Sequence, residues 1–328
     1  MKVVELLERR RQNWQELERY CDRIGSLSAL NTAEISRFSA LYRAACADLA
    51  LSNSYQLPEN TVQYLHKLVG RAHNQLYRSK QFDINAWAKV LLEDVPQRIF
   101  NDRCVQLMFI FFWGFFILSA WLAYSKTAWP EFAEETIPKE MMENMLEHFK
   151  DPIDGSKRDG DMNLKMAGYY IEHNTGIGLQ CFVWGLLVVP GLYITAKNAV
   201  WLGAAFGYMA RSDVPQGENF FHFVRAHGPF ELTAIVLSAG AGLRLGMAWI
   251  MPGQLSRSAS LQKNGAEMMP VMSAAMLMFL FAAIIEGFLS PSAAPLWVKS
   301  GVCLLSSALL AFYFVVLGFP RRLLNAAR

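Results

Sequence analysis

Ionisable side chains within long apolar stretches give this sequence its first candidates for chemistry. His227 and Glu231 stand four residues apart, so on a helix they share one face and could hydrogen-bond or bind one metal ion. A hydrolytic zinc site normally needs three protein ligands and a position open to water. Only Glu286, or the less favourably placed His222, could complete such a set. We therefore expect His227 and Glu231 to form a structural or coupling site, and we assign no metal, no cofactor and no catalytic residue.

Two further charges interrupt the apolar sequence. Arg244 and Glu286 each lie in a run long enough to be buried in a bilayer, where an unpaired charge costs about 2.5–3.5 kcal/mol on insertion scales. We expect Arg244 to pair with Glu286, with Glu231 as the second candidate. Lys299 stands where the last apolar run begins, and we expect its ammonium group to extend to the membrane surface.

Glycines near these charges predict a helix start and a helix contact. Gly228-Pro229 is typical of a helix start, whose free amides and dipole favour the Glu231 carboxylate. Gly242 and Gly246 form a G-x-x-x-G stripe, which lets another helix approach closely. That helix could belong to the same chain or to a second copy in a homodimer.

Five apolar runs are long enough to hold these residues in a membrane. About 20 apolar residues span the bilayer core as a helix, and the runs are Val105–Tyr124, Ile177–Ala196, Gly228–Ile250, Pro270–Leu289 and Ser300–Phe319. The segment Asn198–Ala210 is short for a crossing and suits a re-entrant or half helix, unless it forms a sixth span. The fold class that we expect is all-α, a polytopic transmembrane helical bundle of five to six spans.

The distribution of charge favours six spans, because Lys and Arg collect on the cytoplasmic side. Arg98 and Arg103 precede the first span, and with six spans the C-terminal Arg321–Arg322 falls on the same side. Residues 125–175 hold eleven acidic and six basic residues, which fits an extracytoplasmic acidic loop. The N-terminus does not have the pattern of a signal peptide, so we expect it to be cytoplasmic.

The first hundred residues are as polar as a soluble domain. Apolar residues recur there at helical spacing, and Asn31 followed by Glu34 predicts a capping box at a helix start. We expect a soluble N-terminal helical bundle over residues 1–104, followed by the transmembrane domain over residues 105–328.

Several functional classes lack their sequence signatures. The chain has no phosphate-binding loop, no dinucleotide-binding glycine fingerprint, and no metalloprotease or serine-hydrolase motif. Basic and aromatic residues are not organised for nucleic acid, so we expect no nucleic-acid partner.

Several motifs, taken in order, resemble a known family. They are HGPFEL at His227–Leu232, GAGLRLG at Gly240–Gly246 and IEGFLSPS at Ile285–Ser292, preceded by the glycine-rich KNAVWLGAAFGYM that contains Asn198, Gly203 and Gly207. Over roughly residues 100–320 the chain resembles the stage II sporulation protein M family of bacterial membrane proteins. The N-terminal bundle does not contribute to the resemblance and looks like an appendage.

The resemblance implies a multi-pass protein of the bacterial inner (cytoplasmic) membrane without established enzymatic activity. In spore formers the family member is thought to scaffold peptidoglycan-degrading proteins, and many relatives are encoded near MoxR-type ATPases. The motif positions carried over are His227, Gly228, Glu231, Arg244, Glu286 and Asn198, with Gly203, Gly207, Gly242 and Gly246 as helix-packing positions.

Three functions are compatible with these observations. The one we favour is a non-enzymatic membrane scaffold or assembly factor for envelope complexes. Its partners would be the lipid bilayer, other envelope membrane proteins, and peptidoglycan-remodelling proteins or a MoxR-type ATPase system. The first alternative is a channel or transporter that uses Glu231, Arg244 and Glu286. The second is a membrane-embedded metal-dependent hydrolase that uses His227, Glu231 and Glu286.

Overall fold

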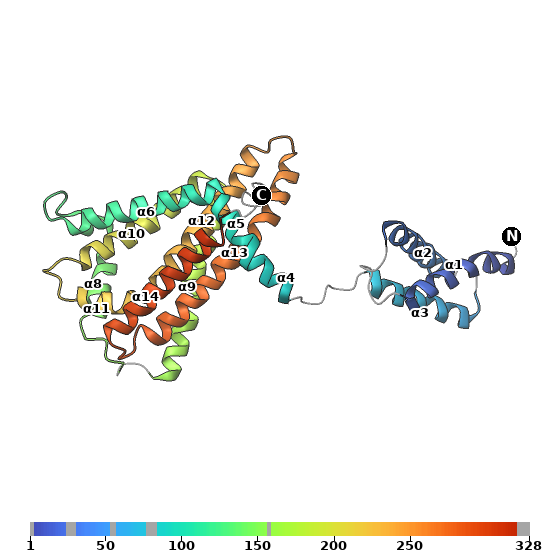
Figure 1. Ribbon diagram of the computed structural model, residues 1–328, viewed down its shortest axis with the longest axis horizontal. Helices are drawn as coiled ribbons and strands as arrows, with labels where there is room; N and C mark the ends of the chain where they lie inside the picture. Colours follow the sequence, from blue (N-terminus) through green and yellow to red (C-terminus); the bar gives the residue numbers. More distant parts are fainter. Residues whose placement is uncertain (1–2, 24–30, 53–56, 77–83, 156–158, 320–328) are drawn as a thin grey trace, which may run out of the picture. The chain divides into compact units, whose positions relative to one another are not determined.

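The computed structural model describes residues 3–23, 31–52, 57–76, 84–155 and 159–319. Every regular element in these residues is a helix, as the sequence predicts (Figure 1). The chain divides into two compact units, Met1–Asp83 and Ile84–Arg328. Each unit has its own core, and the two are described separately below.

The described residues of the N-terminal unit form a bundle of three helices, α1 (Val3–Arg23), α2 (Thr32–Leu51) and α3 (Glu59–Leu76). Its core is apolar and includes Leu17, Phe38, Leu65 and Leu68. The predicted capping box at the start of α2 is confirmed. The Asn31 side chain accepts from the Glu34 amide at 2.9 Å, and the Glu34 carboxylate accepts from the Asn31 amide at 3.0 Å.

The second unit begins earlier than the transmembrane sequence itself. Its first elements are α4 (Ile84–Lys89), a π-helical stretch η2 (Val90–Asp94) and α5 (Val95–Asn101). Val95 and Ile99 are buried in the same core as Met108 of α6 (Arg103–Tyr124), and the Tyr313 hydroxyl donates to the Leu91 carbonyl. The unit boundary therefore falls between Asp83 and Ile84, whereas the sequence analysis places it after residue 104.

Two long helices, α6 and α10 (Val189–Met209), run parallel to each other. Gly203 faces the Phe116 carbonyl of α6, and one turn further along α10, Gly207 faces the Ala120 carbonyl. A methyl group added at these glycines would lie 2.3 Å and 2.0 Å from those oxygens. The two glycines are therefore helix-packing positions, because no larger residue permits this approach.

A second parallel pair consists of α9 (Gly160–Gly185) and α12 (Gly228–Ile250). A methyl group on Gly242 would lie 2.4 Å from the Phe182 carbonyl, and one on Gly246 would lie 2.5 Å from the Gly185 carbonyl. The G-x-x-x-G stripe of α12 is thus covered by α9 of the same chain. Of the two contacts that the stripe allows, the structure shows the one within the chain.

Two helices complete the membrane unit, α13 (Arg257–Ile284) and α14 (Leu296–Ala311). Each continues into a π-helical stretch, η3 (Ile285–Leu289) and η4 (Phe312–Val316) respectively. The antiparallel packing of α12 and α13 is shown by Arg244, which donates to Asn264, and by Glu231, which lies beside Glu286. Short helices connect the long ones, namely α7 (Phe132–Thr136), α8 (Lys139–His148) and α11 (Gly217–Val224).

Among the described residues, the six long helices of the membrane unit alternate in direction along the chain; they are α6, α9, α10, α12, α13 and α14. The start of the first helix lies beside the end of the last one. The Phe100 and Phe319 rings contact each other with centroids 5.9 Å apart, so the start of α6 and the end of η4 share one end of the unit. We call this the proximal end. The opposite, distal end contains the end of α6 and the start of α12, and there Arg225 donates to Ser300 at 3.0 Å.

Four helical segments of the described residues are long and apolar enough to cross a membrane: Arg103–Tyr124, Gly228–Ile250, Arg257–Leu289 and Leu296–Val316. The predicted span at Ile177–Ala196 is wrong, because a turn at residues 186–188 divides it between α9 and α10. Of the two possibilities left open for Asn198–Ala210, the half helix is wrong, because this segment is the second part of the 21-residue α10. Pro190 stands in the first turn of α10, where proline is at home.

The close contact between α6 and α10 leads to a test with two glycines. Gly207→Ala should lower the stability of the membrane unit by about 1–3 kcal/mol, because the added methyl group overpacks against the Ala120 carbonyl. Gly114→Ala on α6 is the matched control, since nothing lies within 4 Å of its added methyl group. Thermal unfolding of the purified protein in detergent measures both. Equal stability of the two variants would contradict the close contact.

Candidate functional site

The candidate site is a group of polar side chains at the distal end of the membrane unit. His227 precedes the first turn of α12, Glu231 lies within that turn, and Glu286 comes from η3. Asn174 of α9 and Ser290, directly after η3, complete the group. We call these five residues the polar cluster. Three elements far apart in the sequence therefore supply it, and their packing brings the five side chains together.

The distances within the polar cluster are short. One ligand atom of each of His227, Glu231 and Glu286 lies within 4.8 Å of the other two. His227 Nε2 lies 3.6 Å from Glu231 Oε2, and Asn174 Nδ2 donates to Glu286 Oε2 at 3.3 Å. His227 is 4 % exposed, while Glu231 and Glu286 are partly buried. The residues that the sequence suggested as a metal set thus converge, with Glu286 as the third member.

Two features fix the orientation of these side chains. His227 Nδ1 is 2.9 Å from the Ser290 hydroxyl, which leaves Nε2 facing Glu231. Glu286 stands in a π-helical stretch closed by a hydrogen bond from the Ser290 amide to the Ile285 carbonyl, 2.9 Å long. Such stretches frequently occur at functional sites, because they change the direction of side chains within a helix.

A buried lysine supports the polar cluster from the neighbouring turn. Lys299 is 0 % exposed, and its ammonium group donates to the Ser290 carbonyl at 2.7 Å, to the Ser292 carbonyl at 3.0 Å and to His222 Nδ1 at 2.9 Å. Burial, and then the charge of Lys299, lower the pKa of His222, which fits its role as an acceptor. The expectation that Lys299 extends to the membrane surface is wrong, since the turn between η3 and α14 surrounds it.

Arg244 lies away from the polar cluster, near the proximal end. Its guanidinium is 3.5 Å from the Asp102 carboxylate and donates to Asn264 Oδ1 at 2.9 Å. The expected pairing of Arg244 with Glu286 is therefore wrong. The reason is the antiparallel packing of α12 and α13, which places the first turns of α13 beside Arg244 and the η3 stretch beside the start of α12. Asp102 also caps α6 by accepting from the Cys104 and Val105 amides.

Two further residues that the sequence suggested, Asn198 and Gly228, contribute no side chain to the polar cluster. Asn198 donates to the Ile194 carbonyl of its own helix at 2.9 Å, and the polar cluster does not include it. Gly228 begins α12, and nothing lies within 4 Å of a methyl group added there. The sequence analysis missed the contributions of Asn174 and Ser290. Their signal was weak, since each is a single polar residue at the edge of apolar sequence.

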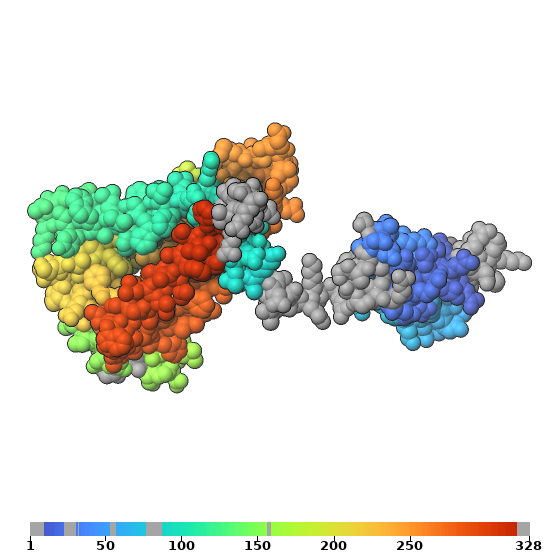
Figure 2. Space-filling model, in the orientation of Figure 1, coloured from blue at the N-terminus to red at the C-terminus, as the bar shows by residue number. Residues whose placement is uncertain are grey.

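A separate cavity of about 930 Å³ lies between α6, α12 and α14. Figure 2 shows the surface hollowed between α6 and α14. Its lining is predominantly apolar and includes Phe109, Trp113, Leu232 and Phe314. Glu231, Arg244 and Glu286 do not line this cavity. Arg225 is the charged residue of its lining, whereas Arg244 and Lys299 contact other helices elsewhere.

The fold and the composition of its helices define a class: an all-helical membrane protein with an additional N-terminal helical unit. Residues 108–291, more than half of the chain, match the model of the stage II sporulation protein M family, and the chain belongs to that family. Residues 4–78 match a family described as a domain of unknown function (DUF8413). Neither a curated protein nor a solved structure matched the chain.

The buried lysine provides a direct test of the distal end. Lys299→Met should destabilise the protein by about 2–4 kcal/mol, because the Ser290 and Ser292 carbonyls lose a charged donor. Lys197→Met is the control, since Lys197 is exposed and its ammonium group lies 4.2 Å above the Trp201 ring, a contact worth about 1 kcal/mol or less. Chemical unfolding in detergent compares the two. A Lys299 variant as stable as the Lys197 variant would contradict a stabilising role for the hydrogen bonds to the Ser290 and Ser292 carbonyls.

Proposed function

We propose that the chain is a non-enzymatic membrane scaffold or assembly factor for cell-envelope complexes. The observation that carries the proposal is the division into two compact units, one of them a soluble-type helical bundle and the other a membrane unit. A bundle attached to a membrane unit can hold a partner at the membrane, because the attachment raises the local concentration of both.

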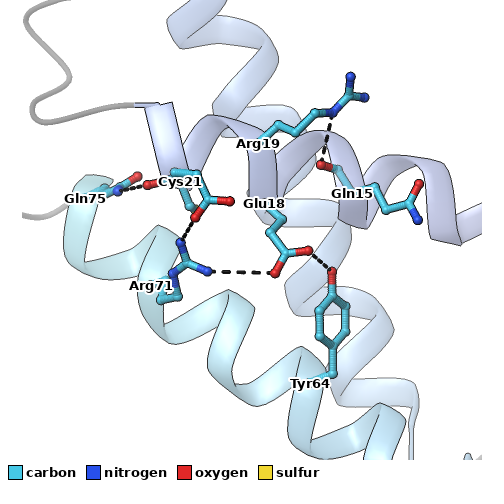
Figure 3. A network of polar contacts seen from close by, with 8 residues as sticks. Gln15, Glu18, Arg19, Cys21, Tyr64, Arg71 and Gln75 are labelled. Carbon is cyan, nitrogen blue, oxygen red and sulfur yellow. Dashed lines mark hydrogen bonds and ion pairs between the residues drawn. The ribbon is translucent and has the colours of Figure 1, made fainter.

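The N-terminal bundle has the character of a docking domain. Its polar side chains pair with one another across helices, as Figure 3 shows for Arg71, Glu18 and Tyr64. Arg71 bonds Asp22 and lies 3.8 Å from Glu18, which accepts from the Tyr64 hydroxyl at 2.9 Å. Burial and the bond to Glu18 raise the pKa of Tyr64 to about 12, so this hydroxyl remains a donor. These pairs fix the three helices and leave a charged outer surface for a partner.

The arrangement of the membrane unit favours a scaffold over a channel or transporter. Arg244 is bonded to Asp102 and Asn264, and the Lys299 ammonium group is bonded to two carbonyls and a histidine. These groups stabilise helix contacts at opposite ends of the unit, and the hollow between α6 and α14 is apolar. A pathway for ions would instead place charges along one continuous polar cavity.

The proposal includes an orientation and a location. We place the protein in the bacterial inner (cytoplasmic) membrane as a multi-pass protein, with its N-terminal bundle and proximal end in the cytoplasm. The meeting of Phe100 and Phe319 supports an even number of crossings, and the alternating directions of the six long helices support six. Partners of the classes that the family resemblance implies are peptidoglycan-remodelling proteins at the distal end and a MoxR-type ATPase system at the bundle.

Site-specific photo-cross-linking in living cells tests the scaffold role. A photoreactive residue is placed at the exposed Arg43 or Lys67 of the bundle, or at Ile117 on the outside of α6 as a control. We expect the two bundle positions to cross-link discrete envelope-associated proteins, and Ile117 to give a different pattern dominated by lipid. The absence of protein cross-links from the bundle, together with ion or solute flux through the purified protein in proteoliposomes, would contradict the scaffold and favour the transporter.

A further inference from the structure

We propose that the polar cluster binds one divalent metal ion, with His227, Glu231 and Glu286 as its protein ligands. One imidazole nitrogen and two carboxylate oxygens suit an ion such as Zn²⁺. The sequence alone favoured a site without metal, because it does not show whether Glu286 or His222 lies close enough to be the third ligand. The structure brings Glu286 close to His227 and Glu231, and this proximity now favours a metal site. This proposal is independent of the scaffold role, since it concerns what joins α12 to η3.

The distances fit a metal ion with little adjustment. Zinc binds imidazole nitrogen and carboxylate oxygen at about 2.0–2.2 Å, so two ligand atoms at a tetrahedral angle stand about 3.3–3.5 Å apart. His227 Nε2 and Glu231 Oε2 are already 3.6 Å apart. All three ligand atoms lie within 4.8 Å of one another, and small rotations of the glutamate side chains would close the set.

The surroundings of His227 prepare its Nε2 atom for a metal. Histidines that bind metals usually donate their other ring N–H to a neighbouring oxygen, which fixes the tautomer and the ring orientation. Here Nδ1 lies 2.9 Å from the Ser290 hydroxyl, so a proton on Nδ1 leaves the Nε2 lone pair directed at Glu231 and Glu286. Phe223 lies edge-on to the imidazole, with centroids 5.8 Å apart, and restricts its movement.

The glutamates also have a supporting contact. Asn174 of α9 donates to Glu286 Oε2 at 3.3 Å, the kind of outer contact that holds a ligating carboxylate in place. The two carboxylates and the imidazole each offer one ligand atom within 4.8 Å of the others. A divalent ion between them would bind both carboxylates and the imidazole nitrogen together.

Metal binding would have a structural consequence. The ion would bridge the start of α12 and the π-helical stretch after α13, and Asn174 would link α9 to the same point. Because the ion binds the folded protein and the unfolded chain has no preformed site, binding raises the stability of the folded form. The site would therefore join the start of α12 and η3 to the middle of α9.

Zinc titration of the full-length protein in detergent tests the proposal. The protein carries an affinity tag without histidine, is treated with a chelator, and then receives ZnCl₂. We expect about one Zn²⁺ per chain to remain after size-exclusion chromatography, and a higher midpoint of thermal unfolding. His227→Gln, Glu231→Gln and Glu286→Gln should each weaken binding at least 10-fold and abolish the thermal shift. Ser290→Ala and Asn174→Ala, which keep all three ligands, should weaken it about 10–100-fold.

Two neighbouring residues serve as matched controls. His173→Gln and Glu172→Gln remove the same chemical groups from exposed positions on α9, next to Asn174, and should bind Zn²⁺ as the unaltered chain does. Co²⁺ in place of Zn²⁺ adds a spectroscopic signature, since its visible absorption bands should be lost in His227→Gln and kept in His173→Gln. Folding of each variant is checked by its elution volume. Absence of stoichiometric Zn²⁺ in the unaltered chain, or retention in all three ligand variants, would overturn the proposal.

Discussion

The close backbone approach of α9 to α12 is the contact on which the rest of the membrane unit depends. Gly242 and Gly246 allow it, because a methyl group at either position would lie within 2.5 Å of a carbonyl of α9. With the two backbones in contact, the register of α9 is fixed, and Asn174 reaches Glu286. Packing in lipid relies on such small residues, because the solvent is as apolar as the helices themselves. The polar cluster is therefore a consequence of glycine packing elsewhere in the same helices.

Arg244 and Lys299 lie near opposite ends of the membrane unit, and each has its own set of polar partners. At the proximal end Arg244 pairs with Asp102, which also caps α6, so one carboxylate serves both a cation and two free amides. At the distal end Lys299 satisfies the carbonyls of the turn that leads into α14. A charge near the centre of a bilayer is costly, whereas at the ends of helices free backbone groups and other side chains provide partners. The metal ion that we propose would likewise provide a charged partner for Glu231 and Glu286.

Sequence reasoning predicted some helices closely and missed the boundary between two others. The expected span at Gly228–Ile250 coincides with α12, because Gly228-Pro229 marks its start. The division between α9 and α10 was missed although Pro190 marks the start of α10, because the turn before it is as apolar as the helices on either side. Arg244 could have been assigned correctly: it lies thirteen residues, or about 20 Å, along the helix from Glu231, and an antiparallel α13 then brings its own beginning to Arg244. The contact of Asn174 depends on tertiary packing that a single sequence does not specify.

The position of α9 along α12 and η3 determines whether Asn174 reaches Glu286. An engineered disulfide tests this register without changing any residue of the polar cluster. A methyl group added at Gly287, beside Glu286, would lie 2.6 Å from the Cβ of Ala167 on α9, so cysteines at these positions need a shift of only about 1 Å to reach disulfide geometry. In a background without the native cysteines, mild oxidation in membrane vesicles should link Ala167→Cys to Gly287→Cys within one chain. Gly168→Cys with Gly287→Cys is the control, because nothing lies within 4 Å of a methyl group at Gly168, and it should remain unlinked. A link in the control pair but none between positions 167 and 287 would contradict the register and, with it, the assembly of the polar cluster.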